Sequence, residues 1–175
     1  MTDKAEHKTE NQRKIMTKGR SVVDITEDDE NVYLAEWVIP KGQTKEDGAE
    51  RRRIIWEMYE SWKTENPSGK RYNKALKDDI IVDNDSISET ATHAYKNYKN
   101  VVAFYCLDKI LANAKKIKNA DLESNRQKKK FKAGYVIIMN ATINTEPYFK
   151  KANLVVGVTK RKEKIMYSVT SIDIK

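Results

Sequence analysis

The 175-residue sequence contains little of what several kinds of functional site require. It has a single cysteine, Cys106, so no disulfide can form within the chain, and this predicts a reducing, cytoplasmic location. One cysteine and two histidines are too few for a zinc site of the cysteine–histidine type, and we expect neither a metal nor a cofactor. The six glycines form no phosphate-binding pattern, which disfavours nucleotide hydrolysis.

Long apolar runs are absent as well. No stretch approaches the roughly 18 apolar residues of a membrane-spanning helix, so we expect no membrane partner. Residues 1–20 lack the apolar region of a secretory signal. They are also too polar to bury a core of their own, and the sequence predicts a flexible N-terminal arm there.

The whole chain has a net charge of +8, and its positive charge is concentrated in the second half. Residues 1–85 carry 16 basic and 19 acidic residues, whereas residues 86–175 carry 18 basic and 7 acidic residues. This asymmetry indicates a polyanion-binding surface on the C-terminal half, with nucleic acid as the expected partner. A lysine-rich surface that is merely solvated would have the same composition.

In residues 21–85 the apolar pattern predicts an N-terminal α/β subregion. Strands are expected at residues 21–25, 32–39 and 79–83. A helix is expected after Thr44, which with Asp47 resembles a capping box. Its apolar residues have helical spacing and continue to Trp62, and residues 66–69, which include Pro67 and Gly69, should end it. The aromatic stripe on this helix is typical of core packing, although exposed Trp56 and Trp62 would instead suggest a contact with a host protein.

Residues 86–175 are expected to fold with helices first and a sheet afterwards. A capping box of Ser86 and Glu89 predicts a helix start, and apolar spacing predicts helical structure up to Ala114. Lys115, Lys116 and Lys118 are expected at the C-terminal end of this helix, where its dipole favours cations, and a polar basic loop is expected at residues 121–130. Three strands should follow within residues 131–144, 148–160 and 164–175, as an antiparallel meander. The whole is an α+β fold with its helices packed on that meander.

Several features of residues 86–175 occur in a recognisable order. A segment containing Thr92–His93–Ala94 and Asn97 precedes a helix with Ala103, Leu107, Leu111 and Ala114. A basic connector, two basic and aliphatic strands and a closing strand at residues 167–172 follow. This layout resembles the barnase–EndoU–colicin–RelE nuclease superfamily, and in particular the small domains of phage and mobile-element polyvalent proteins.

The resemblance implies that residues 86–175 form a toxin-like, metal-independent endoribonuclease domain acting in a bacterial host cell. Such an enzyme moves a proton from the ribose 2′-OH so that this oxygen attacks phosphorus, which leaves a cyclic phosphate. The superfamily pattern carries a histidine in the early helix, which corresponds to His93, and a polar residue on the last strand, where Thr170 or Ser168 stands; we take Thr170 as the catalytic candidate. Lys160 would stabilise phosphoryl charge. A second histidine in the sheet is missing, and Lys132, Tyr135 or Lys160 would have to replace it.

A basic run indicates where nucleic acid would bind, with RNA favoured over DNA. We expect phosphate contacts from this run, from the turn before the last strand and from a hydroxyl on that strand; these residues are Arg126, Lys128, Lys129, Lys130, Lys132, Arg161 and Ser168. Phe131 and Tyr135 could stack on bases. The alternative function is a non-enzymatic phage-encoded module, an inhibitor or accessory protein, that binds nucleic acid or a host protein.

Overall fold

The computed structural model describes residues 39–132, 134–145 and 148–173 and four short strands nearer the N-terminus. These strands are β1 (Ile15–Met16), β2 (Val22–Val23), β3 (Ile25–Glu27) and β4 (Val32–Leu34). The arm expected at residues 1–20 lies outside the described residues except for β1. The expected strands at 21–25 and 32–39 are described only in part.

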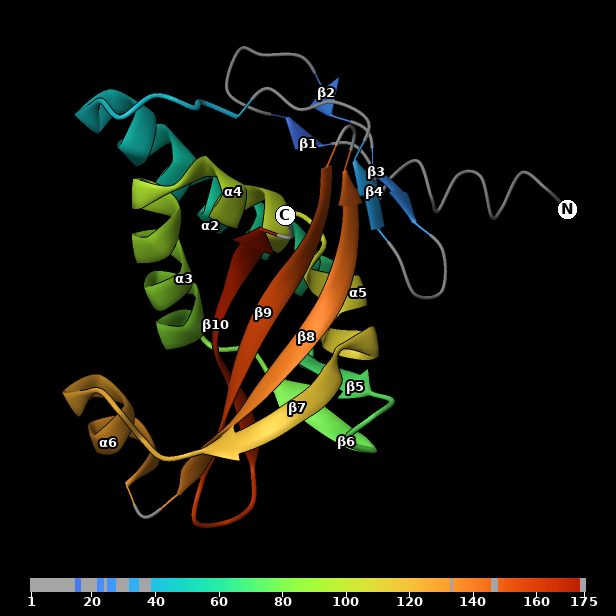
Figure 1. The fold of residues 1–175 in the computed structure, drawn as a ribbon, viewed down its shortest axis with the longest axis vertical. Helices are drawn as coiled ribbons and strands as arrows, with labels where there is room; N and C mark the ends of the chain where they lie inside the picture. Colours follow the sequence, from blue (N-terminus) through green and yellow to red (C-terminus); the bar gives the residue numbers. More distant parts are fainter. Residues whose placement is uncertain are drawn as a thin grey trace, which may run out of the picture.

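The predicted α+β fold is confirmed (Figure 1). The described helices are α2 (Lys45–Glu65), α3 (Asn84–Lys96), α4 (Tyr98–Phe104), α5 (Leu107–Asn113) and α6 (Asn125–Phe131). The further strands are β5 (Lys70–Asn73), β6 (Asp78–Ile81), β7 (Lys115–Ala120), β8 (Tyr135–Thr145), β9 (Tyr148–Val158) and β10 (Lys164–Asp173).

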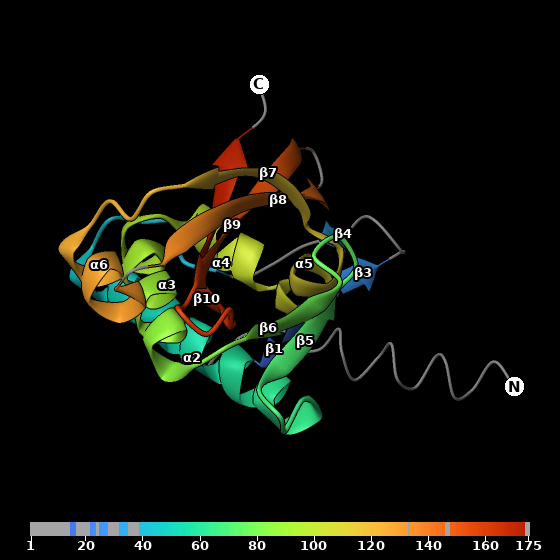
Figure 2. The ribbon, with the colours of Figure 1, turned by 90° about the horizontal axis from the view of Figure 1, so that it is seen from below.

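Strands β1 and β2 pair with each other, and the other eight form one mixed sheet in the order β3-β4-β8-β9-β10-β6-β5, with β7 paired to β8. Strands β8, β9 and β10 make the predicted antiparallel meander. Strand β6 joins β10 in parallel, and β4 joins β8 in parallel. Figure 2 shows the sheet curling around α4 and α5, so that one of its faces is turned inward onto helices.

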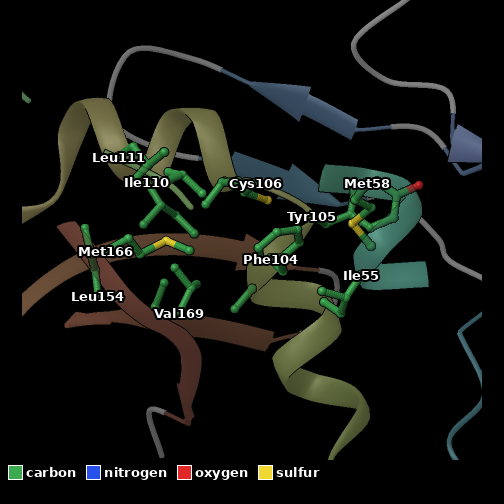
Figure 3. Close-up of a cluster of buried hydrophobic side chains, with 14 of the residues drawn as sticks. Ile55, Met58, Phe104, Tyr105, Cys106, Ile110, Leu111, Leu154, Met166 and Val169 are labelled. Atoms are coloured by element: carbon green, nitrogen blue, oxygen red, sulfur yellow. The ribbon is translucent and has the colours of Figure 1, made fainter. Parts of the chain in front are cut away.

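The hydrophobic core lies between this inner face and the helices (Figure 3). Leu154 and Val156 of β9 lie opposite Met139 and Ile137 of β8, and all four are buried. Residues directly opposite in an antiparallel pair share a face, so these positions define the inner face and their neighbours along each strand define the outer face. Core residues come from both sides of position 85/86, for example Ile54 and Ile80 as well as Phe104 and Val169.

Helix α2 begins as the sequence predicts, because the Asp47 amide donates to Thr44 Oγ1 at 3.1 Å. Its aromatic stripe faces the core. Trp62 is buried and its indole donates to Asp108, while Trp56 is partly buried against the core. The stripe is therefore used for packing, and little of its surface is exposed for contact with a host protein.

A buried arginine connects α2 to the end of α3. Arg51 is 1% exposed, and its guanidinium donates to the carbonyl oxygens of Ala94, Tyr95, Pro40 and Gly42 at 2.6–2.8 Å. The first two carbonyls belong to the last turn of α3, where carbonyl oxygens lack partners within the helix and carry partial negative charge. The charge of Arg51 is thus stabilised by backbone dipoles.

The edge of β10 is completed by helix side chains in place of a strand. Only Lys164 and Ile165 pair with β6. Beyond them the Met166 carbonyl accepts from the Ser86 hydroxyl, the Val169 amide donates to Thr90 Oγ1, and the Ser171 amide donates to Asn100 Oδ1. Ser86, Thr90 and Asn100 are all buried, so their polar groups satisfy backbone groups that water does not reach.

Three local predictions for the second half are wrong. Residues 115–118 continue no helix but form β7, an edge strand on β8. The expected loop at 121–130 contains most of helix α6. Ser124 caps the start of this helix, because its side chain accepts from the Gln127 amide. The capping box of α3 consists of Asp83 and Ser86, not Ser86 and Glu89.

We predict that Thr90→Val lowers the free energy of unfolding by about 1–3 kcal/mol, because it leaves the buried Val169 amide without an acceptor. Thr92→Val is the matched control. Its hydroxyl is exposed and donates to the Ser88 carbonyl within the same helix. We expect the control to change stability by no more than about 0.5 kcal/mol in urea denaturation. Equal losses in the two variants would contradict the role of Thr90 at the strand edge.

Candidate nucleic-acid interface

Helix α6 is attached to the outer face of the sheet by its last residue. Phe131 is 2% exposed and lies over Gly157 of β9, where a Cβ atom would come within 2.0 Å of the ring. The Tyr167 ring meets it edge-on, with the ring centroids 6.2 Å apart. Phe131 is therefore buried, and the prediction that it stacks on a base is wrong. Tyr135 is half-buried and packs against the core.

Two of the expected phosphate-binding residues instead hold α6 against α3. Lys130 Nζ lies 2.8 Å from Asp83 Oδ2 and 3.1 Å from Asp85 Oδ2. Arg126 lies 2.8 Å from Glu89 Oε2. Burial alone would raise the pKa of Asp83, but hydrogen bonds from Lys130 and Ser86 outweigh it, and the pKa is lowered.

The remaining basic residues gather at one end of the sheet, which we call the basic end. Gly134 lies so close to Val158 that a Cβ atom on it would be 1.9 Å from the Val158 carbonyl oxygen. This contact places the residues after α6 beside the turn between β9 and β10. The basic end comprises the exposed side chains of Lys128, Lys129, Lys132, Lys160, Arg161 and Lys162.

His93 lies on the exposed side of α3, in contact with a carboxylate. Its side chain is 43% exposed, and Nε2 is 3.3 Å from Glu89 Oε1. The other Glu89 oxygen binds Arg126, so this carboxylate joins an imidazole to a guanidinium. We call these three residues the Glu89 cluster.

The Glu89 cluster is close to the segment of β10 that contains Thr170. The Asn100 side chain donates to the His93 carbonyl at 3.1 Å and accepts from the Ser171 amide at 2.9 Å. One amide group therefore ties the backbone of His93 to the residue that follows Thr170. The structure brings these two expected catalytic positions into the same neighbourhood.

Lys160 and Arg161 lie elsewhere. Lys164 pairs with Val158 next to the turn, whereas Thr170 pairs with Asn153 six residues farther along β10. At about 3.3 Å per residue, this separates Thr170 from the turn by roughly 20 Å. Ser168 lies between them and is 5% exposed, so its hydroxyl has little contact with solvent.

Sequence reasoning missed Glu89 as a partner of His93. The signal was present, because residues four apart on a helix share a face. Glu89 was instead assigned to a helix cap that Asp83 provides. The partner of Lys130 has no comparable signal, since Asp83 and Asp85 lie more than 40 positions away in the chain.

Among the described residues, no three histidine, cysteine, aspartate or glutamate side chains lie together in an arrangement suited to a metal ion. None of the described helices is long and apolar enough to cross a membrane.

Comparisons with protein-family models, with curated proteins and with solved structures found no match for this chain.

We predict that Lys130→Gln lowers the free energy of unfolding at pH 7 by about 0.5–1 kcal/mol, a small effect because the Asp83 side chain is 37% exposed. The folded pKa of Asp83 lies below its unfolded value of about 3.9, so this stabilisation is present above that pH. The stabilisation from this ion pair is lost as the pH falls through the folded pKa of Asp83. Urea denaturation of the wild type and the variant between pH 2 and pH 7 measures this loss.

Lys128→Gln is the matched control, because Lys128 is on the same helix and forms no ion pair with a described acidic residue. It should leave stability unchanged at every pH. A deficit of Lys130→Gln that stays constant down to pH 2 would contradict the pairing with Asp83.

Proposed function

We propose that this protein binds RNA through its basic end. The observation that carries the proposal is that the chain leaving α6 lies beside the end of β9, so that α6 and the β9–β10 turn, which carry six exposed basic side chains between them, belong to the same end of the sheet. None of the six forms an ion pair with an acidic residue of the described part of the chain. Unpaired lysine and arginine side chains attract phosphates and release counterions on binding.

The size of this electrostatic effect is measurable. Each phosphate neutralised on a single strand contributes about −0.7 to the slope of log affinity against log salt concentration. Six contacts would give a slope of about −4. Arg126 and Lys130 are not counted, because their partners on α3 already neutralise them.

We predict that the triple variant Lys128→Gln, Lys129→Gln and Lys160→Gln makes the salt slope less negative by about 2 and weakens binding to single-stranded RNA. Fluorescence anisotropy at several salt concentrations measures both. The matched control replaces Lys70, Lys74 and Lys77, three exposed lysines of the β5–β6 hairpin, with Gln. It removes the same charge and should keep the wild-type slope. Equal effects of the two variants would show that net charge alone governs binding.

RNA cleavage is a second candidate, favoured by the Glu89 cluster next to Thr170. His93 would accept the proton of the ribose 2′-OH, and the oxygen would then attack the adjacent phosphorus. The bond from phosphorus to the 5′ oxygen breaks, and that oxygen leaves with a proton from solvent. The products are a 2′,3′-cyclic phosphate and a 5′-OH end.

The other members of the cluster would support this step. Glu89 would orient the imidazole, and Arg126 would hold the Glu89 carboxylate in place through its other oxygen. The Thr170 hydroxyl would hydrogen-bond the phosphate. Lys160, in the turn that precedes β10, would contact a more distant phosphate of the same RNA.

We predict that the wild type forms cyclic-phosphate ends in the presence of a chelator, as the resemblance to metal-independent ribonucleases implies. His93→Asn should reduce the rate at least about 100-fold and leave RNA affinity unchanged. Glu89→Gln should reduce it less. If the wild type binds RNA but forms no cyclic-phosphate product, the cleavage proposal fails and the binding proposal stands.

A further inference from the structure

Four residues form a polar row across the outer face of the sheet. The register places Lys115 of β7 opposite Asn140 of β8, Asn140 opposite Asn153 of β9, and Asn153 opposite Thr170 of β10. Ala152 and Leu154, the neighbours of Asn153, are fully buried in the core. The row therefore lies on the opposite face, and it spans about 14 Å at strand spacings of roughly 4.8 Å.

Lysines flank this row on the same face. Lys118 lies opposite Ile138, and Lys151 lies opposite Thr142. Together with Lys115 they are exposed, and none forms an ion pair with a described acidic residue. Of the described helices only α6 reaches the outer face, at the Gly157 end, four residues along β9 from Asn153.

One hydrogen-bonding group of the row has no partner within the described structure. Asn140 Oδ1 is buried and accepts no hydrogen bond. Leaving such an acceptor unpaired costs about 1–3 kcal/mol, and a donor supplied by a ligand would recover it after a small rotation of the side chain. The row thus combines an unsatisfied acceptor, further amide and hydroxyl groups, and three positive charges.

The row also leads to the Glu89 cluster. Thr170 is its last member, and the next residue, Ser171, is tied to the His93 carbonyl by Asn100. A chain lying along the row would therefore arrive at His93.

We infer that this polar row binds a segment of single-stranded RNA and directs it across the strands toward His93. The inference rests on the proposed RNA-binding function and adds a second contact surface to it. Lys115, Lys118 and Lys151 bind phosphates. The amides of Asn140 and Asn153 hydrogen-bond the Watson–Crick edges of bases, which are accessible only when the bases are unpaired. No acidic side chain is present in the row or its flanking pairs.

The test compares oligoribonucleotides of about 4 and about 12 nucleotides, a range within known site sizes for single strands. The variant Lys115→Gln, Lys118→Gln, Lys151→Gln should weaken binding of the long oligonucleotide at least about fivefold and make its salt slope less negative by about 2. The short oligonucleotide, which the basic end alone can hold, should be little affected. The control with Lys70, Lys74 and Lys77 replaced should behave as wild type.

A second variant separates hydrogen bonding from charge. Asn153→Thr keeps a residue suited to a strand and should weaken binding of the long oligonucleotide about 2- to 10-fold without changing the salt slope. Circular dichroism checks that each variant is folded.

The outcomes distinguish the two proposals. If the wild type binds no oligonucleotide, the proposed function and this inference both fail. If it binds, but both row variants keep wild-type affinity for the long oligonucleotide, only the polar row is overturned. Equal wild-type affinity for heparin or for a 12-base-pair duplex would also overturn the assignment to single-stranded RNA.

Discussion

The fold depends on the satisfaction of one open strand edge. After two pairs with β6, strand β10 has no further strand on that side among the described residues, yet it lies under helices where water cannot bond to its backbone. Ser86, Thr90 and Asn100 supply the missing partners from α3 and α4. Because each bond is specific in position, these three side chains also fix where α3 lies along the strand.

The placement of α3 in turn determines the candidate site. Glu89 and His93 are on the same helix as Ser86 and Thr90, so the bonds that fix the buried side of α3 also fix its exposed side. Arg51 holds the last turn of α3 by donating to the carbonyl oxygens of Ala94 and Tyr95. Asp83 holds the first turn as its cap and also receives Lys130 from α6. The position of the imidazole therefore follows from contacts made by buried neighbours.

The sequence allowed prediction where local patterns and burial agree. Helix α2 has a cap, a continuous apolar stripe and a stop at residues 66–69, and the structure has all three. Strand β7 was mistaken for the end of a helix, because Lys115, Lys116 and Lys118 carry no period-two pattern and are exposed on both faces. Its strand conformation comes from pairing with β8, which only the tertiary structure provides. Likewise α6 is short and basic, and a contact with Gly157 decides its position.

The candidate site was predictable where it depends on local patterns, and not where it depends on the pairing of strands. The charge asymmetry pointed to the basic end, and His93 lies where a polar helix face would place it. The separation of Thr170 from Lys160 depends on strand register, and the polar row depends on four strands that meet only in the fold. The alternation of Asn140 with Thr142, and of Lys151 with Asn153, was a sequence signal for that row that composition alone does not reveal.

The attachment of α6 has a consequence for how tightly a polyanion could be held. This helix has seven residues, and one ring over a glycine and two sets of ion pairs connect it to the rest of the protein. Such a small unit can detach locally while the main core stays intact. A ligand that binds Lys128 and Lys129 in the docked helix must keep α6 docked, and the free energy needed for this lowers the affinity. Amide exchange in α6 would therefore slow on complex formation, even though none of its backbone groups needs to touch the ligand.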